Sequence, residues 1–209
     1  MGYVRLARPA DAEEIARIQL TTWRVAYRRL LPRHVLDQLD PAWLTGRWIE
    51  SISTPPTPTH RVLVAIEQAG PGGQAESSQH AEPAEPGPDS APGAAAYLVG
   101  FAASGPADDA ALAPDEPADS LGAGTAAVTE LLVEPRWGRR GHGSRLLAAC
   151  VAGWRNDGFD MAVGWAYEQD PATRGFLAGA GWEPDGARRA LDVDDLLVPQ
   201  LRMHTRLIE

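Results

Sequence analysis

Apolar residues recur at two spacings along the chain, and the first part of the sequence shows both. Residues 3–7 have the length and composition of a short strand. A set of residues then recurs at helical spacing on one face: Ile15, Ile18, Thr22, Val25 and Ala26. This spacing predicts a helix that begins at Asp11, where Asp11 and Glu14 resemble a capping box, and that continues to about Arg29. A second helical segment is predicted over residues 41–51.

The middle of the chain contains three apolar runs of strand length. Residues 61–67 and 97–104 lie on either side of a segment without large apolar residues, as expected of a hairpin whose turn has grown. Residues 125–134 follow as a third run, which ends in a turn rich in Gly and Arg. We therefore expect three strands here, the first two paired as a hairpin.

The last third of the sequence continues this alternation. A helix that ends near Gly158 has an apolar face made of Leu146, Leu147, Cys150, Val151 and Trp154. Met161–Tyr167 is the next predicted strand, residues 171–180 form a helix with Pro at its start, and residues 200–208 form a final strand. The whole pattern predicts a single domain of mixed α/β class over residues 1–209, packed around one core.

The net charge of −9 has a specific location. Residues 68–96 and 105–124 carry four and five acids and no arginine, so together they account for the whole net charge. The first segment contains no Val, Ile, Leu, Met, Phe, Trp or Tyr, so it has no large apolar side chain whose burial could offset the entropy lost on ordering. We interpret it as a mobile acidic insertion. The second is a similar acidic loop, but it contains Leu112 and Leu121, which can hold it partly in place.

Composition excludes several classes of protein. All 19 basic side chains are arginine, so the lysine required by phosphate-binding-loop hydrolases and by pyridoxal enzymes is absent. Cys150 is the only cysteine, and the histidine spacing fits no zinc motif, so we expect no metal site. The longest apolar stretch, residues 146–154, is too short to span a bilayer, and the N-terminus lacks an apolar signal core. We therefore expect a cytoplasmic protein without membrane association.

The most informative segment is residues 133–147, in which a predicted strand enters a turn with Gly138, Gly141 and Gly143 and leaves as a helix. The first amides of a helix lack intrahelical partners and lie at the positive end of the helix dipole. The N–H groups of residues 141–144 can therefore hold a phosphate or pyrophosphate, and glycine lets the backbone approach it closely.

Four arginines surround the same turn and suit a multiply charged ligand: Arg136, Arg139, Arg140 and Arg145. The His142 imidazole can contact phosphate too, or it can face solvent as an ordinary loop residue. A plain helix start with exposed arginines is the alternative interpretation of the turn. A dinucleotide site is disfavoured, because Leu146 replaces the third glycine of that motif and Asp160 precedes the next strand instead of ending it.

At this segment the sequence resembles the GCN5-related N-acetyltransferase (GNAT) family, which transfers an acetyl group from acetyl-CoA to an amine. The family shows a strand that ends in an apolar-x-Pro sequence, then Arg or Gln, two residues, Gly, one residue, and Gly or Ala. Residues 128–135 read VTELLVEP and residues 138–143 read GRRGHG. The spacing agrees, with Gly138 where Arg or Gln is usual.

The resemblance extends to later and earlier segments, and covers nearly the whole chain apart from the two acidic segments. Residues 165–170 (WAYEQD) and 175–182 (GFLAGAGW) match a strand, a cofactor-binding Asn and a helix with Phe-Tyr before Gly-Phe, with Asp170 in place of Asn and Leu177 in place of Tyr. Residues 22–32 also look like the opening of many bacterial members.

The resemblance implies a mixed, mostly antiparallel central sheet with splayed middle strands and helices on both faces. It also implies acetyl-CoA as cofactor, with its pantetheine arm on the backbone at Leu132 and Val133 and its pyrophosphate on the turn. The cofactor-binding residues that it implies are Leu132, Val133, Gly138, Arg139, Arg140, Gly141, His142, Gly143, Ser144 and Asp170.

Aminolysis of a thioester requires a neutral amine and a proton for the leaving thiolate. Glu130 is the candidate general base, and a salt bridge at the rim of the sheet is the alternative role for it. Leu177 cannot donate a proton, so Tyr167 is the candidate donor, although packing is an alternative role there as well. Trp23 and Tyr27 border the acceptor groove in the family's layout and are the candidate substrate-binding residues.

The predicted function is acetyl-CoA-dependent N-acetyl transfer to a primary amine of a small molecule or peptide. An acyl-CoA-binding sensor or interaction module with little or no catalysis is the alternative, suggested by Leu177 and Asp170. Nucleic-acid binding is disfavoured by the net negative charge and the scattered arginines. A homodimer is expected by analogy only.

Overall fold

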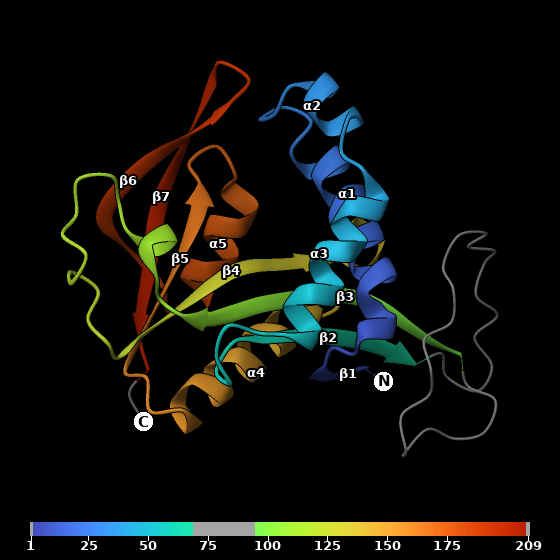
Figure 1. Cartoon of the computed structure of the whole chain (residues 1–209), viewed down its shortest axis with the longest axis horizontal. Helices are drawn as coiled ribbons and strands as arrows, with labels where there is room; N and C mark the ends of the chain where they lie inside the picture. Colours follow the sequence, from blue (N-terminus) through green and yellow to red (C-terminus); the bar gives the residue numbers. More distant parts are fainter. Residues whose placement is uncertain (1, 69–94, 208–209) are drawn as a thin grey trace.

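The protein was analysed as a computed structural model, which describes residues 2–68 and 95–207 (Figure 1). The predicted acidic insertion at residues 68–96 therefore lies almost entirely outside the described residues. No helix in the described ranges is long and apolar enough to cross a membrane.

The described residues form a seven-stranded sheet with the strand order β1-β2-β3-β4-β5-β7-β6. Its strands are β1 (Gly2–Leu6), β2 (Arg61–Gln68), β3 (Ala96–Pro106), β4 (Thr125–Val133), β5 (Met161–Tyr167), β6 (Glu183–Val193) and β7 (Leu196–Arg206). Each neighbouring pair is antiparallel except β4 and β5, which run parallel. The predicted fold class, a mixed and mostly antiparallel sheet with helices, is confirmed.

Within the described ranges, five α-helices accompany the sheet: α1 (Ala12–Ala26), α2 (Arg33–Asp37), α3 (Pro41–Ser53), α4 (His142–Asn156) and α5 (Pro171–Gly179). Helices α1 and α3 pack on one face, where Ile15, Ile18 and Leu44 meet Val64 and Phe101 in one buried cluster. Figure 1 shows α4 on the opposite side of the β2–β4 strands. There its apolar face forms a second cluster with residues of β2, β3, β5 and β7.

The central strands β4 and β5 pair only over their first halves. Thr125–Val128 of β4 is in register with residues 161–164 of β5, and the pairing ends at Gly164. Beyond these residues β5 continues beside β7, while β4 continues beside β3. The two strands therefore diverge, as the family resemblance implied, and they leave an opening in the middle of the sheet.

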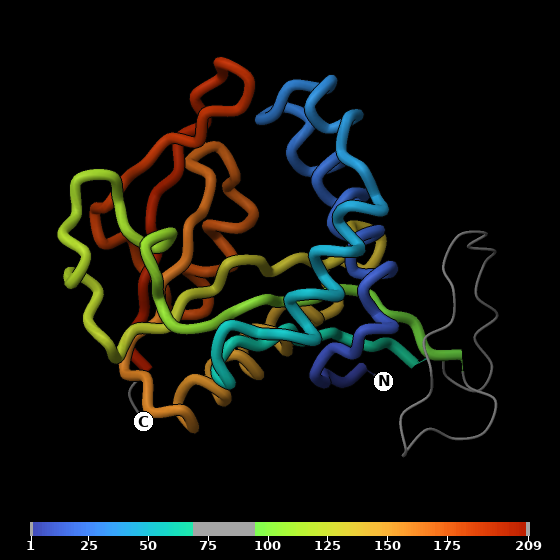
Figure 2. The backbone as a smooth tube through the Cα atoms, in the orientation of Figure 1, coloured from blue at the N-terminus to red at the C-terminus, as the bar shows by residue number. Residues whose placement is uncertain are grey.

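The two halves of the molecule also meet at the far side of this opening. Figure 2 shows the β6–β7 hairpin and the α1–α2 segment both rising above the central strands. His34 of α2 forms an ion pair with Asp194 at the turn of the hairpin. Asp194 and Asp195 both have positive φ, as expected of the tight turn between β6 and β7.

Most predicted elements are present within two residues of their expected bounds, but four predictions were wrong or incomplete. The last strand, β7, begins at Leu196 and not at Gln200. Strand β6 was not predicted, because it is a largely exposed edge strand with few apolar residues. Helix α2 was not predicted, since its five residues are too few to show a period. The first helix ends at Ala26 and not near Arg29, and Val25 is 53% exposed although its spacing suggested the buried face.

The predicted capping box at Asp11 is absent from the described structure. The Asp11 carboxylate accepts hydrogen bonds from the Arg5 guanidinium, at 2.7 and 2.8 Å, and from the backbone N–H of Arg8 at 2.6 Å. Glu14 pairs with Arg17 instead of reaching back to the helix start. The nearby guanidinium outcompetes the helix amides for the carboxylate, so Asp11 links strand β1 to helix α1.

The acidic loop over residues 105–124 is docked on the sheet, and its first two residues belong to β3. Leu121 packs against Ala111, Ala127 and Val163. The buried Arg202 of β7 donates hydrogen bonds to the backbone oxygen of Ala111 and to Glu116, as well as to Asp185 of β6. The expectation that leucines partly hold this loop is confirmed for Leu121. The hydrogen bonds from the Arg202 guanidinium also hold the loop, and the sequence did not suggest them.

Candidate active site

The turn between β4 and α4 presents the first amides of α4 outward. A 3₁₀ turn at Pro135–Trp137 leads into it, and both Arg139 and Gly141 have positive φ. Gly141 is the N-cap residue of α4, and no described side chain caps it. The amides at the start of this 15-residue helix therefore remain available to an anion, which agrees with the predicted phosphate-binding geometry.

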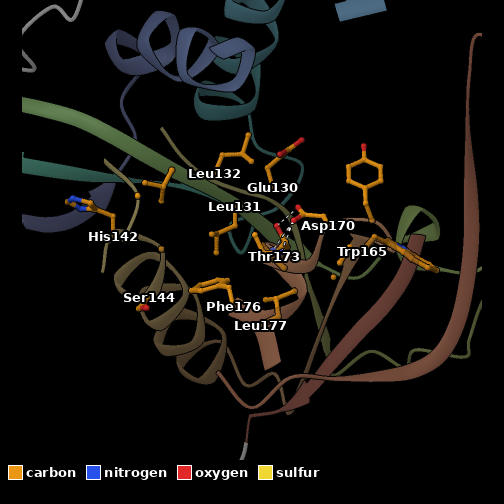
Figure 3. Close-up of a pocket in the computed structure, with 18 of the residues that line it drawn as sticks. Glu130, Leu131, Leu132, His142, Ser144, Trp165, Asp170, Thr173, Phe176 and Leu177 are labelled. Atoms are coloured by element: carbon orange, nitrogen blue, oxygen red, sulfur yellow. Dashed lines mark hydrogen bonds between the residues drawn. The ribbon is translucent and has the colours of Figure 1, made fainter. Parts of the chain in front are cut away.

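A cavity of about 610 Å³ starts at this turn and extends into the opening between β4 and β5. The predicted residues that line it are Trp23, Tyr27, Glu130, Leu132, Val133, Gly138, Arg139, Gly141, His142, Gly143, Ser144, Tyr167 and Asp170. In Figure 3 His142 and Ser144 lie at one end, Trp165 lies at the other, and Glu130 and Asp170 lie between them. One continuous cavity thus connects the anion-binding turn to the candidate base.

The diverging edge of β4 forms one wall of the cavity. Residues 129–133 line it just past the point where the pairing with β5 ends. Phe176 and Leu177 of α5 line it as well, and Figure 3 shows them below Leu131 across the cavity. The cavity is therefore bounded by peptide groups along β4 and by apolar side chains from α5, a combination that suits a long, partly polar ligand.

Glu130 is partly buried on β4, opposite Ala103 of β3. Burial raises the pKa of its carboxyl group to about 7, and the Gln19 side chain partly opposes this rise. A carboxyl group whose pKa lies near neutral pH can both accept and release a proton under physiological conditions. The alternative of a rim salt bridge does not hold, because the described ion pairs do not include Glu130.

Two tyrosines meet near Glu130. The rings of Tyr27 and Tyr167 are 4.9 Å apart and contact edge to face. Burial raises the pKa of both hydroxyl groups, and the negative charge of Glu130 raises both further. Both side chains therefore carry their proton at neutral pH. Tyr167 therefore has the packing role that the sequence offered as an alternative, and its role as proton donor stays a prediction.

Asp170 is the N-cap residue of α5. Its carboxylate accepts hydrogen bonds from the backbone N–H groups of Ala172 and Thr173, both at 3.1 Å, and from the Thr173 hydroxyl at 2.6 Å (Figure 3). Asp170 lines the cavity, but its oxygens are used to hold the helix start. Leu177, about two turns further on, is buried and lines the cavity without any group that could donate a proton.

Two predicted phosphate contacts are placed differently from the expectation. The Arg140 guanidinium does not line the cavity but lies 4.9 Å from the ring centre of Trp137. The His142 side chain is only 1% exposed, and its Nδ1 lies 3.0 Å from the Arg145 guanidinium while its Nε2 lies 3.6 Å from Glu67. The alternative that the imidazole faces solvent was wrong, because the ring is buried and Trp137 packs edge to face against it, whereas contact with phosphate stays a prediction.

Several residues at the cavity were not singled out from the sequence. Trp165, Thr173 and Gln200 belong to this group, and Gln19, which does not line the cavity, affects the pKa of Glu130. Trp165 supports the wall next to Tyr167, and the guanidinium of Arg189 lies 4.3 Å from its ring centre. The one available sequence signal was Gln19, a polar residue on the otherwise apolar face of the first helix.

Comparisons with known proteins agree with the fold. No protein-family model matches the sequence, and no curated protein matches it either. Among solved structures, a GCN5-related N-acetyltransferase from Kribbella flavida has 16% sequence identity, covering 98% of this chain and 97% of its own, with a TM-score of 0.60. PaiA N-acetyltransferase from Thermoplasma acidophilum, solved with coenzyme A, has 14% identity, 99% coverage of both chains and a TM-score of 0.60.

A third structure, a Salmonella typhimurium protein solved with its cofactor acetyl-CoA, has 16% identity and a TM-score of 0.59. It covers 100% of this chain and 95% of its own. These similarities extend over nearly the whole length of each chain. The chain therefore has the fold of the GCN5-related N-acetyltransferases.

Proposed function

We propose that this protein is an acetyl-CoA-dependent N-acetyltransferase that acts on a primary amine of a small molecule or peptide. One observation carries this proposal. A single cavity joins a turn with free helix amides to Glu130, whose carboxyl pKa lies near 7. An anion site and a neutral-pH base in the same cavity are what an amine acetyltransferase with a nucleotide-bearing donor requires.

The residues along the cavity fit acetyl-CoA. The amides of residues 141–144, together with Arg139, suit its pyrophosphate. The open backbone edge at Leu132 and Val133 offers peptide N–H and C=O groups to its pantetheine arm. Two of the similar structures were solved with coenzyme A or acetyl-CoA, which supports the same ligand here.

When bound, acetyl-CoA would supply an acetyl thioester. Glu130 would accept the proton of the incoming ammonium group at a carboxylate oxygen, either directly or through water. Because its carboxyl pKa is about 7, roughly half of the molecules carry the ionised form at neutral pH. Peptide N–H groups on the open edge of β4 are the available donors for the negative charge that develops on the carbonyl oxygen.

Tyr167 is the proposed proton donor, since Leu177 cannot take this role. Its hydroxyl group keeps its proton at neutral pH and belongs to a residue that lines the cavity on the Glu130 side. Trp23 of α1 and Tyr27, the C-cap residue of that helix, line the same part of the cavity and form the proposed acceptor wall. Aromatic faces and a nearby carboxylate attract an amine that arrives as a cation.

The proposal is tested by following coenzyme A release from acetyl-CoA in the presence of a panel of primary amines. We expect amine-dependent release with at least one acceptor class. We also expect Glu130→Gln to lower that release by about 10²-fold or more, as for loss of a general base, while acetyl-CoA binding is retained. Binding of acetyl-CoA without amine-dependent release by the wild type would favour the sensor alternative and would overturn the proposal.

A further inference from the structure

Three polar side chains form a row across strands β5, β7 and β6. Gln200 of β7 lies opposite Tyr167 of β5 on one side and opposite Arg189 of β6 on the other. Residues directly opposite each other in antiparallel strands point to the same face of a sheet. The row therefore extends from Tyr167, which lines the cavity, through Gln200 to Arg189.

The side-chain amide of Gln200 has a fixed direction. Nε of Arg189 donates a hydrogen bond to its Oε1, and the two atoms are 2.7 Å apart. A guanidinium group can only donate, so this bond identifies the oxygen end of the amide, and the NH₂ end points the other way.

The NH₂ group of Gln200 is available as a donor at the cavity. Gln200 is only 6% exposed and lines the cavity, and the described hydrogen bonds of its side chain involve the oxygen alone. The described side-chain atoms that are both buried and without a partner do not include this nitrogen, so it has access to open space. A ligand in the cavity can therefore supply the acceptor atom that this group lacks.

The charge of Arg189 has no carboxylate partner among the described residues, whereas the neighbouring Arg188 forms an ion pair. The other contacts of its guanidinium are the backbone oxygen of Ala110 and the ring of Trp165, and neither of them is charged. Arg189 is also partly buried, so water screens its charge less than at an open surface. This end of the cavity therefore favours a negatively charged group.

Opposite charges thus lie on the two sides of Tyr167. In the strand order, Glu130 of β4 is on one side of β5, and Arg189 of β6 is on the other. Both act on the Tyr167 hydroxyl, because the negative charge of Glu130 raises its pKa and the positive charge of Arg189 lowers it. Figure 3 shows Trp165, on which Arg189 packs, at the end of the cavity beyond Glu130.

We propose that the acceptor is a free amino acid, with its amine beside Glu130 and its carboxylate on the NH₂ group of Gln200, and that Gln200 determines this specificity. The charge of Arg189 assists by attracting the carboxylate and by orienting the Gln200 amide. This inference rests on the proposed function, because it names the class of amine that the same cavity acetylates.

The carboxylate takes no part in the chemistry. From the ammonium form of the amino acid, one proton would pass to Glu130. The neutral nitrogen would then bond to the acetyl carbon as the carbon–sulfur bond breaks, and its second proton would replace the one that Tyr167 gives to the leaving thiolate. The products are the N-acetylated amino acid and coenzyme A.

The first test compares each of several amino acids with its carboxamide and with its decarboxylated amine, using coenzyme A release by the wild type. Hydrogen bonds to a charged group are stronger than those to a neutral one. We therefore expect kcat/KM for the acid to exceed that for the carboxamide by about tenfold or more, and to exceed that for the decarboxylated amine further, after correction for the neutral fraction of each amine.

The second test changes the row and follows the same substrates. Gln200→Glu keeps an oxygen for Arg189 and replaces the NH₂ donor by a second oxygen. It should lower kcat/KM for the acid by about 10²-fold, mainly through KM, because a like charge faces the carboxylate. The decarboxylated amine should not lose kcat/KM, and its turnover shows that the variant is folded.

Arg189→Met should also reduce the preference for the acid, because the Gln200 amide can then turn over and the positive charge is gone. Arg188→Met is the matched control, since Arg188 is the next residue of β6 and its side chain is 69% exposed. Its preference among the three kinds of substrate should equal that of the wild type.

The outcomes separate this inference from the proposed function. Equal kcat/KM for the acid and the decarboxylated amine, or equal losses for both in Gln200→Glu, would overturn the inference and leave amine acetylation standing. A preference for the carboxamide would overturn the free amino acid in favour of a peptide amino terminus. Absence of turnover with every amine would overturn the proposed function and this inference with it.

Discussion

The hydroxyl of Thr173 donates a 2.6 Å hydrogen bond to the carboxylate of Asp170, whose other oxygen accepts two backbone N–H groups of α5. Asp170 is thus both the cap of α5 and a charge in the cavity lining. These two properties can be separated by substitution. Asn can still cap a helix but is neutral, whereas Ala can do neither.

We expect Asp170→Ala to lower the free energy of unfolding by about 1 kcal/mol through loss of the cap. Asp170→Asn should change it by only a few tenths of a kcal/mol, within the range of good N-cap residues. Asp170→Asn should also bind acetyl-CoA more tightly, because a negative charge near a multiply charged anion is removed. Urea denaturation and calorimetric titration measure the two effects, and unchanged affinity would show that this charge does not act on the cofactor.

Ionisation of Glu130 should lower the free energy of unfolding. The carboxyl pKa is about 7 in the folded protein against an ordinary value of 4.5, so between these pH values the folded state holds a proton that the unfolded state has released. Stability contributed by this proton is full below pH 4.5 and is lost as the pH rises through 7. Gln carries no such proton, so Glu130→Gln should gain about 1–3 kcal/mol relative to the wild type between pH 4.5 and pH 8.

Urea denaturation of the wild type and Glu130→Gln at both pH values measures this difference, and other titrating groups cancel in the comparison. A difference in unfolding free energy that does not vary with pH would mean that Glu130 ionises at its ordinary value. In that case the carboxyl group would not be tuned for proton transfer at neutral pH.

Arg202 should control the acidic loop and, through Trp165, the cavity wall next to Tyr167. It is buried, binds Glu116 and Asp185, and its guanidinium lies 5.7 Å from the ring centre of Trp165. We expect Arg202→Met to lower the unfolding free energy by roughly 2–3 kcal/mol, because two carboxylates lose their charged partner. Hydrogen exchange over residues 107–124 should also become faster.

The matched control is Arg188→Met, because Arg188 pairs with Glu168 but its side chain is 69% exposed. An exposed pair of this kind contributes about 0–1 kcal/mol. Arg202→Met should raise KM for the amine through Trp165 and leave acetyl-CoA affinity unchanged. Equal effects of the two variants on exchange in the loop would contradict the docking role of Arg202.

The Tyr167 hydroxyl should matter for turnover but not for binding. Tyr167→Phe keeps the ring that contacts Tyr27 and removes the proton donor. We expect kcat to fall by about tenfold, less than the usual contribution of an acid catalyst, because a thiolate is a good leaving group. Tyr27→Phe is the comparison variant, and a larger loss of kcat there would transfer the donor role to Tyr27.

The sequence predicted the elements that bury a periodic apolar face and the turn that carries a glycine motif. Helix α4 and strand β5 are examples, since Leu146 and Trp154 recur at helical spacing and residues 161–167 form a short apolar run. Strand β6 escaped prediction because an exposed edge strand buries little. Val25 was misjudged because α1 extends at its C-terminal end beyond the sheet that its other residues cover.

The sequence predicted those parts of the candidate site that depend on the local backbone. It did not predict the parts that depend on contacts between elements far apart in the chain. Glu130 and the amides of residues 141–144 lie on adjoining elements, so one stretch of sequence contains both. The burial that raises the Glu130 pKa, and the Gln19 side chain that opposes it, come from a helix more than 100 residues earlier in the chain. Likewise, the spacing of residues in the sequence cannot show that the Trp137 ring packs against the His142 imidazole.

The central claim is that acetyl-CoA binds in the cavity that begins at the α4 turn. Gly143 lies in this lining, and a Cβ there would meet Phe176 at 3.5 Å, an ordinary contact that the fold tolerates. Leu at position 143 should instead fill the cavity. Gly46→Leu on α3 is the matched control, because a Cβ at that helical glycine meets nothing within 4 Å and the residue lies outside the lining.

Calorimetric titration with acetyl-CoA compares these two variants with the wild type. We predict binding to the wild type and to Gly46→Leu with equal affinity, and at least about tenfold weaker binding to Gly143→Leu, equivalent to about 1.4 kcal/mol. Thermal unfolding should show that both variants remain folded. Binding to Gly143→Leu with wild-type affinity, or absence of binding to the wild type, would contradict the claim that this cavity is the acetyl-CoA site.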